Sequence, residues 1–289
     1  MTLTLLSGLG EIAGRYDGLI LDLWGVLHDG TAPFPGVVDA LSRLKQAGKR
    51  LCVLSNAPRR AHLVEQRMNE IGLVRGLYDH VHSSGEEAWQ HLLRRDDPFY
   101  AALGRRCYHI GPARDDNMLE GVDLERVAEI EEAEFILNTG PSGWDETVEQ
   151  YEALLREARA RDLPMVCANP DLVVVSQGRR AICAGVVAQR YEALGGRVRW
   201  HGKPFRPVYE TCFAALGIAD RRRLLAVGDS LRTDIAGANA AGIASLLVTG
   251  GIHAEEFGLV GGQPDLDRLV EAVAASGHRP DAVIAHFRW

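Results

Sequence analysis

The chain lacks long apolar runs and paired cysteine motifs, and each absence excludes a class of protein. No run of about 18 apolar residues exists, so we expect no membrane-spanning helix. The N-terminal segment also lacks the basic start and apolar stretch of a secretory signal. The five cysteines are widely spaced and include no Cys-x-x-Cys pair. We therefore expect free thiols and a cytoplasmic protein.

Basic clusters and histidine pairs are equally scarce. The net charge is −7, and the only basic block is the triplet Arg221-Arg222-Arg223, so nucleic acid is not an expected partner. The ten histidines include no His-x-x-x-His pair, and the sequence therefore predicts no zinc site. Apolar content of 46% and charged content of 25% are ordinary for a globular protein. A chain of 289 residues can form one large domain and a smaller one.

The most informative feature of the sequence is a carboxylate at the end of an apolar run. Asp22 follows Gly18-Leu19-Ile20-Leu21, which has the composition of a buried strand. In an open parallel sheet, ligands bind beyond the carboxyl ends of the strands. The same arrangement recurs where Leu51-Cys52-Val53-Leu54 precedes Ser55-Asn56, where Val198-Arg199-Trp200 precedes Lys203, and where Leu224-Leu225-Ala226-Val227 precedes Asp229. We expect these four places to outline one active site.

The acidic residues among them are suited to phosphoryl transfer. Asp22 can act as a carboxylate nucleophile, which divides one difficult hydrolysis into two easier steps. Asp229 and Asp234 offer the hard oxygen ligands that Mg²⁺ prefers. A cation there would reduce the repulsion between Asp22 and an anionic substrate and stabilise the charge that develops on the transferred oxygens. The sequence thus predicts an aspartyl intermediate and a magnesium site.

The remaining residues supply positive charge and hydrogen-bond donors. Lys203 would provide a fixed positive charge beside the phosphoryl group. Ser55, Asn56 and the backbone N–H groups of the helix that follows them would donate to phosphate oxygens. Pro58 fits the first turn of that helix, where a missing N–H costs nothing. Phosphate binding and the start of this helix are therefore expected to coincide.

These motifs resemble those of the haloacid dehalogenase (HAD) superfamily of aspartate-nucleophile hydrolases. The resemblance rests on Asp22-Leu23-Trp24-Gly25-Val26, Ser55-Asn56, Lys203-Pro204 and Gly228-Asp229 through Asp234, with further support from Asn169-Pro170-Asp171 and Val248-Thr249-Gly250-Gly251. Within the superfamily it points to class IIA, whose large C2-type cap lies between the second and third motifs. This class includes sugar-phosphate, nitrophenyl-phosphate, phosphoglycolate and pyridoxal-phosphate phosphatases. The resemblance implies Mg²⁺ as cofactor, a small phosphorylated substrate and, because exposed caps often dimerise, a homodimer as an allowed assembly.

The expected fold is α/β: a doubly wound, mainly parallel Rossmann-like core with an inserted α/β cap. Apolar runs alternate with amphipathic helices from about Gly18 to Val81, and the helical segment Val37 to Gly48 joins two strands that a right-handed crossover makes parallel. We predict the first part of the core at 1–82, the cap at 83–178 and the second part of the core at 179–289.

One residue departs from the family pattern. In the phosphatases of the family a second Asp lies two residues after the nucleophile and acts as general acid and base, whereas this chain has Trp24. An indole N–H is a donor without useful acidity, so proton transfer by this side chain is excluded. The backbone carbonyl of Trp24 remains available to the metal, and the resemblance implies a metal site of Asp22, Trp24, Asp229 and Asp234.

Three interpretations of Trp24 stay open. The leaving group needs no proton, as with an acyl phosphate; or His28 or Asp29 supplies the proton; or the protein binds a phosphorylated ligand without turning it over, as a sensor or scaffold. Because Asp22, Lys203, Asp229 and Asp234 are all present, the sequence favours a working hydrolase.

Overall fold

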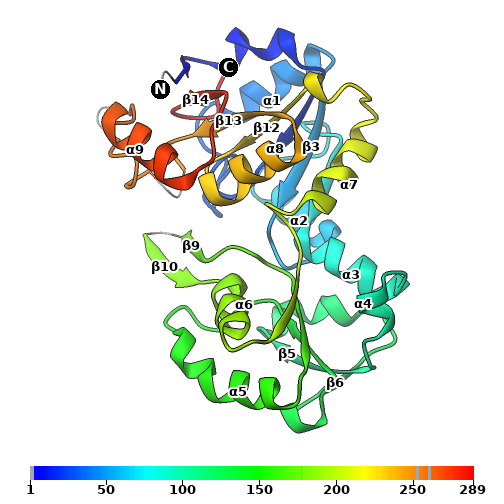
Figure 1. Cartoon of the computed structure of the whole chain (residues 1–289). Coiled ribbons are helices and arrows are strands. Elements are labelled where there is room, and N and C mark those ends of the chain that lie inside the picture. Colours follow the sequence, from blue (N-terminus) through cyan, green and yellow to red (C-terminus); the bar gives the residue numbers. More distant parts are fainter. Residues whose placement is uncertain (1–2, 177, 252–253, 260–261) are drawn as a thin grey trace. The chain divides into compact units, whose positions relative to one another are not determined.

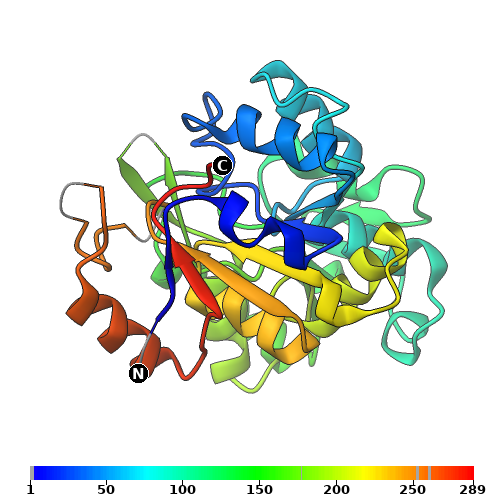
Figure 2. The same cartoon turned by 90° about the horizontal axis from the view of Figure 1, so that it is seen from above.

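A computed structural model describes residues 3–176, 178–251, 254–259 and 262–289 and is shown in Figures 1 and 2. The described chain forms two compact units. Unit 1 comprises the described residues of Met1–Ser55, Glu65–His82 and Lys203–Trp289, and unit 2 comprises Asn56–Val64 and Ser83–Gly202. None of the helices in these ranges has the length and apolar character that a membrane crossing requires.

Unit 1 is built on a sheet of seven strands in the order β1-β14-β13-β12-β2-β3-β4. The strands are β1 Leu5–Leu6, β2 Gly18–Leu21, β3 Arg50–Ser55, β4 His80–Ser83, β12 Leu224–Gly228, β13 Ala244–Val248 and β14 Ala282–Ile284. All the pairings from β1 through to β3 are parallel. Figure 2 shows the red strand β14 beside the orange strand β13, with the blue N-terminal segment along its other edge.

The helices of unit 1 lie in the connections between these strands. They are α1 Val37–Gln46, α2 Ala61–Glu70, α7 Arg206–Leu216, α8 Ala236–Ala241 and α9 Leu266–Ser276, with shorter turns at Leu9–Glu11, Ala13–Arg15, Arg221–Arg223 and Leu231–Ile235. β2 and β12 are buried along their whole length, as parallel strands covered on both faces must be. α1 connects β2 to its parallel neighbour β3, and the α/β fold predicted from the sequence is confirmed.

Unit 2 has its own five-stranded parallel sheet, in the order β11-β8-β7-β5-β6, and a separate hairpin of β9 and β10. The strands are β5 Arg106–Ile110, β6 Glu125–Val127, β7 Phe135–Asn138, β8 Pro164–Cys167, β9 Val173–Ser176, β10 Arg179–Ile182 and β11 Arg197–Trp200. The helices are α3 Ser84–Arg94, α4 Pro98–Ala101, α5 Glu152–Ala160 and α6 Ala184–Ala193, with shorter turns at Ala113–Leu119, Ile130–Glu132 and Val148–Tyr151.

The two faces of this second sheet bury alternate residues of its strands. Ile136 and Met165 pack in one cluster with side chains of α5 and α6, whereas Phe135 and Val166 pack in another with side chains of α3. In Figure 1, α5 and α6 accordingly lie on one side of the sheet and α3 and α4 on the other. Each unit therefore has a hydrophobic core of its own.

The boundary of the second unit differs from the prediction that the core resumes at 179. β10, α6 and β11 belong to unit 2, which ends at Gly202, and β11 pairs in parallel with β8. Buried residues of α6, such as Val187 and Tyr191, pack into the unit 2 core, and Trp200 of β11 packs against the same cluster. A short apolar run fits either sheet, and only this packing decides which one it joins. β11, the strand before Lys203, thus belongs to the sheet of unit 2 and not to the sheet that carries Asp22.

Candidate active site and family

Asp22 lies at the carboxyl end of β2, beside the end of its neighbour β12. Its backbone N–H donates to the carbonyl of Val227 at 2.8 Å, which extends the pairing of the two strands by one residue. Asp229 directly follows β12. The two carboxylates thus leave adjacent strands at the same edge, the position at which open parallel sheets bind ligands.

Asp234 completes a group of three buried carboxyl groups with Asp22 and Asp229. One oxygen of each lies within 4.8 Å of the others. Asp22 is 8% exposed, Asp229 is 2% exposed and Asp234 is 4% exposed. Asp234 belongs to the turn that follows β12, and its Oδ2 accepts the N–H of Ser230 at 3.1 Å. A β-carbon at Gly228 would lie 2.0 Å from Cγ of Asp234, so only glycine fits there.

Lys203 places its ammonium group against this cluster. Its Nζ pairs with Oδ1 of Asp22 and lies 2.8 Å from Oδ1 of Asp234. Burial alone would lower the pKa of Lys203, but the carboxylates of Asp22 and Asp234 outweigh it and hold this pKa well above its ordinary value. Lys203 is therefore a permanent positive charge, although the strand before it belongs to the other unit.

The three carboxyl groups fit a divalent cation. They offer hard oxygen donors from a compact, buried set, which is the chemistry that Mg²⁺ and Ca²⁺ take. Lys203 brings one positive charge to three carboxyl groups, and a divalent ion matches the excess of negative charge in this four-residue cluster. Asp22, Asp229 and Asp234 are therefore the residues that would hold it.

Ser55 and Asn56 fall on either side of the boundary between the units. Ser55 is the buried last residue of β3, which is the other neighbour of β2. Asn56 opens unit 2, and its Nδ2 donates to Oδ1 of Asp171 at 2.8 Å. The side chain of Asn56 is thus engaged with the motif Asn169-Pro170-Asp171, and its contact with phosphate stays a prediction.

The helix after Asn56 begins later than predicted. α2 begins at Ala61, so Pro58 lies in the turn before it and not in its first turn. The carboxylate of Glu86 fixes this start, because its Oε2 accepts the N–H of Ala61 at 3.1 Å and Nε of Arg60 at 2.8 Å. The prediction that Pro58 lies in the first turn of this helix was therefore wrong, and phosphate binding by the N–H groups after Asn56 stays a prediction.

Trp24 packs within the turn that follows Asp22. Its ring meets His28 edge to face at 5.3 Å, and a β-carbon at Gly30 would lie 2.4 Å from the indole. His28 is buried, and its Nδ1 accepts the N–H of Gly30 at 2.8 Å. The indole and its neighbours therefore form a packed turn without a carboxyl group at position 24.

Neither of the two proposed substitutes holds a transferable proton at neutral pH in this turn. Burial lowers the pKa of His28 to about 4, so its imidazole is neutral. Asp29 accepts hydrogen bonds from the hydroxyl of Thr31 and from the N–H groups of Ala32 and Thr31, which lower its pKa to about 2. The geometry gives no support to His28 or Asp29 as general acid.

Tyr209 and Gly251 also contact the carboxylate cluster, and the sequence analysis gave neither a role there. Tyr209 lies on the buried face of α7, and its hydroxyl donates to the carbonyl of Asp234 at 3.3 Å. A β-carbon at Gly251 would lie 2.1 Å from Oδ2 of Asp229. The motif Val248-Thr249-Gly250-Gly251 was the available signal for the glycine, whereas Tyr209 gave none beyond its helical periodicity.

Comparison with known proteins agrees with this geometry. A family model described as haloacid dehalogenase-like hydrolase matches residues 19–125, and a second, HAD-hydrolase-like model matches residues 200–289. The structure is similar to that of a hydrolase of the haloacid dehalogenase-like family from Brucella suis 1330, with 33% identity, a TM-score of 0.84 and coverage of 98% of this chain and 99% of that one.

Two further similarities concern phosphatases from Mycobacterium tuberculosis. D-glycerol 3-phosphate phosphatase is 34% identical over 249 residues, which cover 84% of this chain and 65% of that protein. This chain therefore spans about two thirds of that relative's length. The crystal structure of a glycerol phosphate phosphatase with calcium matches with a TM-score of 0.63 and 29% identity, over 83% of this chain and 68% of that one. The structure with magnesium matches with a TM-score of 0.62 and 28% identity, over 83% of this chain and 70% of that one. With the family models and the near-complete match to the Brucella hydrolase, these findings show that the chain belongs to the haloacid dehalogenase-like family of hydrolases.

Proposed function

We propose that this protein is a Mg²⁺-dependent phosphatase that hydrolyses a small phosphorylated metabolite through a covalent phosphoryl intermediate on Asp22. The observation that carries the proposal is the buried group of Asp22, Asp229 and Asp234, whose oxygens lie within 4.8 Å of one another beside the ammonium of Lys203. Relatives named as glycerol phosphate phosphatases, one of them crystallised with magnesium, support the substrate class and the metal.

The residues would divide the reaction into two displacements at phosphorus. In the first, a carboxylate oxygen of Asp22 forms a bond to phosphorus while the bond to the leaving oxygen breaks. In the second, water attacks phosphorus, inorganic phosphate departs and the carboxylate of Asp22 is restored. Lys203 would stabilise the charge on the phosphoryl oxygens, and Ser55 and Asn56 would donate hydrogen bonds to them.

A bound Mg²⁺ would neutralise charge on the phosphoryl oxygens during both displacements. Asp22, Asp229, Asp234 and the backbone carbonyl of Trp24 would hold it. The hydrogen bond from Ser230 N–H to Oδ2 of Asp234 and the ion pair of its Oδ1 with Lys203 orient that carboxylate, so Asp234 would act on the metal through water.

Trp24 narrows the substrates that fit this mechanism. An indole donates no proton to the leaving oxygen, and general acid–base catalysis typically contributes about 10²–10⁴ in rate. We infer that good substrates are phosphates whose leaving group departs unprotonated, such as acyl or aryl phosphates. The second candidate function, a protein that binds a phosphorylated ligand without turnover, rests on the same residue.

Turnover of acetyl phosphate and nitrophenyl phosphate, with and without Mg²⁺, tests the proposal. We expect Mg²⁺-dependent release of phosphate that Asp22→Asn abolishes. The matched control is Asp39→Asn, because Asp39 is a solvent-exposed carboxylate of α1 that pairs with Arg43 of the same helix. Turnover that survives Asp22→Asn would overturn the covalent mechanism. Absence of turnover, with phosphate still protecting the wild type against unfolding, would favour the binding protein.

A further inference from the structure

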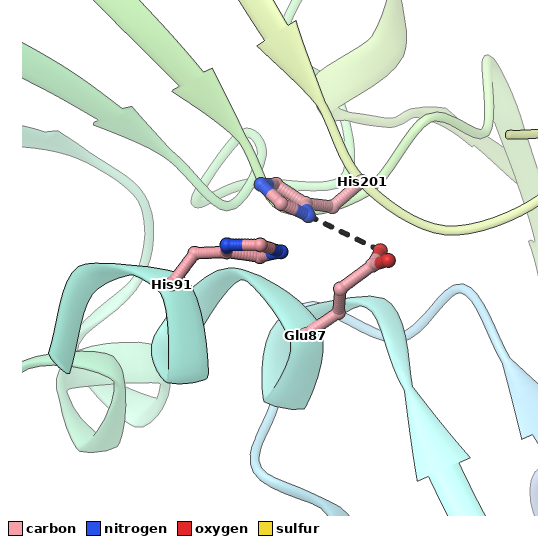
Figure 3. Close-up of side chains that lie close together, drawn as sticks. All are labelled: Glu87, His91 and His201. Carbon is pink, nitrogen blue, oxygen red and sulfur yellow. Dashed lines mark ion pairs between the residues drawn. The ribbon is translucent and has the colours of Figure 1, made fainter. Parts of the chain in front are cut away.

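A second group of metal-binding side chains lies in unit 2, and it contains nitrogen donors. Glu87 and His91 are one helical turn apart on α3, and His201 follows β11. One donor atom of each lies within 4.8 Å of the others, and Figure 3 shows the two imidazoles and the carboxylate directed toward one another. The expectation of no zinc site rested on the absence of a His-x-x-x-His pair; here Glu87 takes one of those two positions and the third side chain comes from a distant segment.

The carboxylate of Glu87 connects α3 to the residues that follow β11. Its Oε2 lies 3.1 Å from Nδ1 of His201 and accepts the N–H of Gly202 at 2.9 Å. Glu87 and His201 are buried, whereas the side chain of His91 is 36% exposed. His91 thus lies on the side from which an ion could enter. Around a tetrahedral zinc ion with bonds of about 2.0–2.1 Å, donor atoms lie roughly 3.3 Å apart, so small side-chain movements would close the group.

Tyr100 holds both imidazoles in place. Its hydroxyl is hydrogen-bonded to Nε2 of His201, and its ring stacks on His91 with centroids 5.1 Å apart and planes 14° apart. In metal sites the second nitrogen of a ligating histidine is usually hydrogen-bonded in this way, which fixes the orientation of the ring.

His91 offers one of its two ring nitrogens to this group. Its Nδ1 is buried and without a hydrogen-bond partner. Its other ring nitrogen is the one that faces Glu87 and His201 in Figure 3.

We propose that Glu87, His91 and His201 bind a divalent transition metal ion, with Zn²⁺ as the ion that their chemistry fits best. Two imidazoles and one carboxylate are a ligand set that zinc takes, and a water molecule would complete the tetrahedron. The carboxylate cluster of unit 1 offers oxygen alone and suits Mg²⁺, so the two sites select different ions.

The ion would join the two ends of the longer segment of unit 2, Ser83–Gly202. α3 begins at Ser84, next to the start of this segment, and His201 is the residue before its last, Gly202. The backbone is already tightly packed there, because a β-carbon at Gly202 would lie 2.6 Å from Cβ of Ser84. The ion would therefore have a structural role within unit 2, and it would take no part in the displacement at phosphorus.

Calorimetric titration with Zn²⁺, on the full chain stripped with a chelator and saturated with Mg²⁺, tests the proposal. The excess of Mg²⁺ fills the carboxylate cluster, so we expect one further ion per chain. His91→Gln and Glu87→Gln should weaken its binding by about 100-fold or more. His62→Gln, at an exposed position of α2, is the matched control and should bind like the wild type.

Co²⁺ absorption and thermal unfolding make the outcome decisive. Co²⁺ should give the intense visible bands of a four-coordinate nitrogen-containing site in the wild type and lose them in His91→Gln. Zn²⁺ should raise the Tm of the wild type and leave that of His91→Gln unchanged, while the metal-free variant keeps a cooperative transition because His91 is partly exposed. No extra ion in the wild type, or equal Zn²⁺ affinity in His91→Gln, would show that the group is a hydrogen-bonded triad without a metal.

Discussion

At the scale of single residues, position 24 decides what the carboxylate cluster can do. Asp22, Asp229, Asp234 and Lys203 assemble within unit 1 through contacts with one another. Trp24 packs on Gly30 and His28, and position 24 therefore has no carboxyl group. In the mechanism that we propose, Asp22 supplies the nucleophile and Lys203 stabilises charge, and proton transfer is the function that position 24 does not supply.

A first prediction concerns the dependence of rate on the leaving group. Wild-type rates for a series of aryl and alkyl phosphates should fall steeply as the pKa of the leaving group rises, because Trp24 donates no proton. Trp24→Asp should flatten this dependence and speed up alkyl phosphates, by up to about 10²–10⁴. Steady-state kinetics of the series measures both slopes.

Trp24→Asn is the matched control for that variant. It leaves the same cavity beside Gly30 and cannot transfer a proton, so its slope should stay as steep as in the wild type. Equal slopes for Trp24→Asp and Trp24→Asn would show that the cavity, and not proton transfer, changes the rate. Rapid hydrolysis of alkyl phosphates by the wild type would show that another acid exists.

At the scale of elements, apolar runs followed by polar residues located most of the site. β2, β3 and β12 could be predicted because each contains a continuous apolar run, with Asp22, Ser55 and Asp229 at or just beyond its end. β11 could not be placed, because a run of four residues fits either sheet. The start of α2 depends on Glu86, a residue distant in sequence, and no local pattern indicates it.

The turn after β12 yields a prediction about the metal. Asp229 directly follows the strand, and Asp234 lies further along the turn, where the N–H of Ser230 donates to its Oδ2 and Lys203 pairs with its Oδ1. Asp229→Ala should therefore abolish Mg²⁺ binding, and Asp234→Ala should weaken it by about 10–100-fold, as expected for a residue that acts through water. Isothermal titration calorimetry measures both, and equal losses would contradict this division of roles.

His109 of β5 yields a prediction about pH. Its side chain is fully buried, its Nε2 is 2.8 Å from Oγ1 of Thr139, and burial lowers its pKa below the ordinary 6.5. The imidazole of His109 therefore binds a proton more tightly in the unfolded chain than in the folded protein. The stability that the neutral imidazole contributes is fully present above pH 6.5 and is lost as the pH falls toward the lower pKa of the folded protein. Each unit of separation between the two pKa values corresponds to about 1.4 kcal/mol.

Urea unfolding at a series of pH values from about pH 7 to about pH 5 tests whether the free energy of unfolding falls on acidification. His109→Gln should be less stable at neutral pH, and its free energy of unfolding should decrease less on acidification than that of the wild type. His62→Gln on exposed α2 should keep the wild-type slope. A slope for His109→Gln as steep as the wild type's would assign the acid sensitivity to other groups.

At the scale of the whole molecule, each candidate ion site is complete within one compact unit. Asp22, Lys203, Asp229 and Asp234 all belong to unit 1, and Glu87, His91 and His201 all belong to unit 2. The first group could be predicted because Asp22, Lys203 and Asp229 come shortly after strand-like runs, and Asp234 lies in the turn that follows the last of these runs. The second could not, because its ligands share no motif and meet only through the packing of α3 against the end of β11.

This division predicts that Mg²⁺ stabilises the two units unequally. A ligand slows only those opening reactions that destroy its site, and each unit has its own hydrophobic core. At a concentration about 100 times its Kd, Mg²⁺ should therefore slow amide hydrogen exchange in β2 and β12 by up to about 100-fold, which corresponds to about 2.7 kcal/mol. Exchange in β7 and β8 of unit 2 should stay unchanged. Mass spectrometry of peptides from the full chain resolves these strands, and Asp229→Ala should remove the effect in unit 1. Equal protection of both sets of strands would mean that the units unfold together, as one cooperative structure.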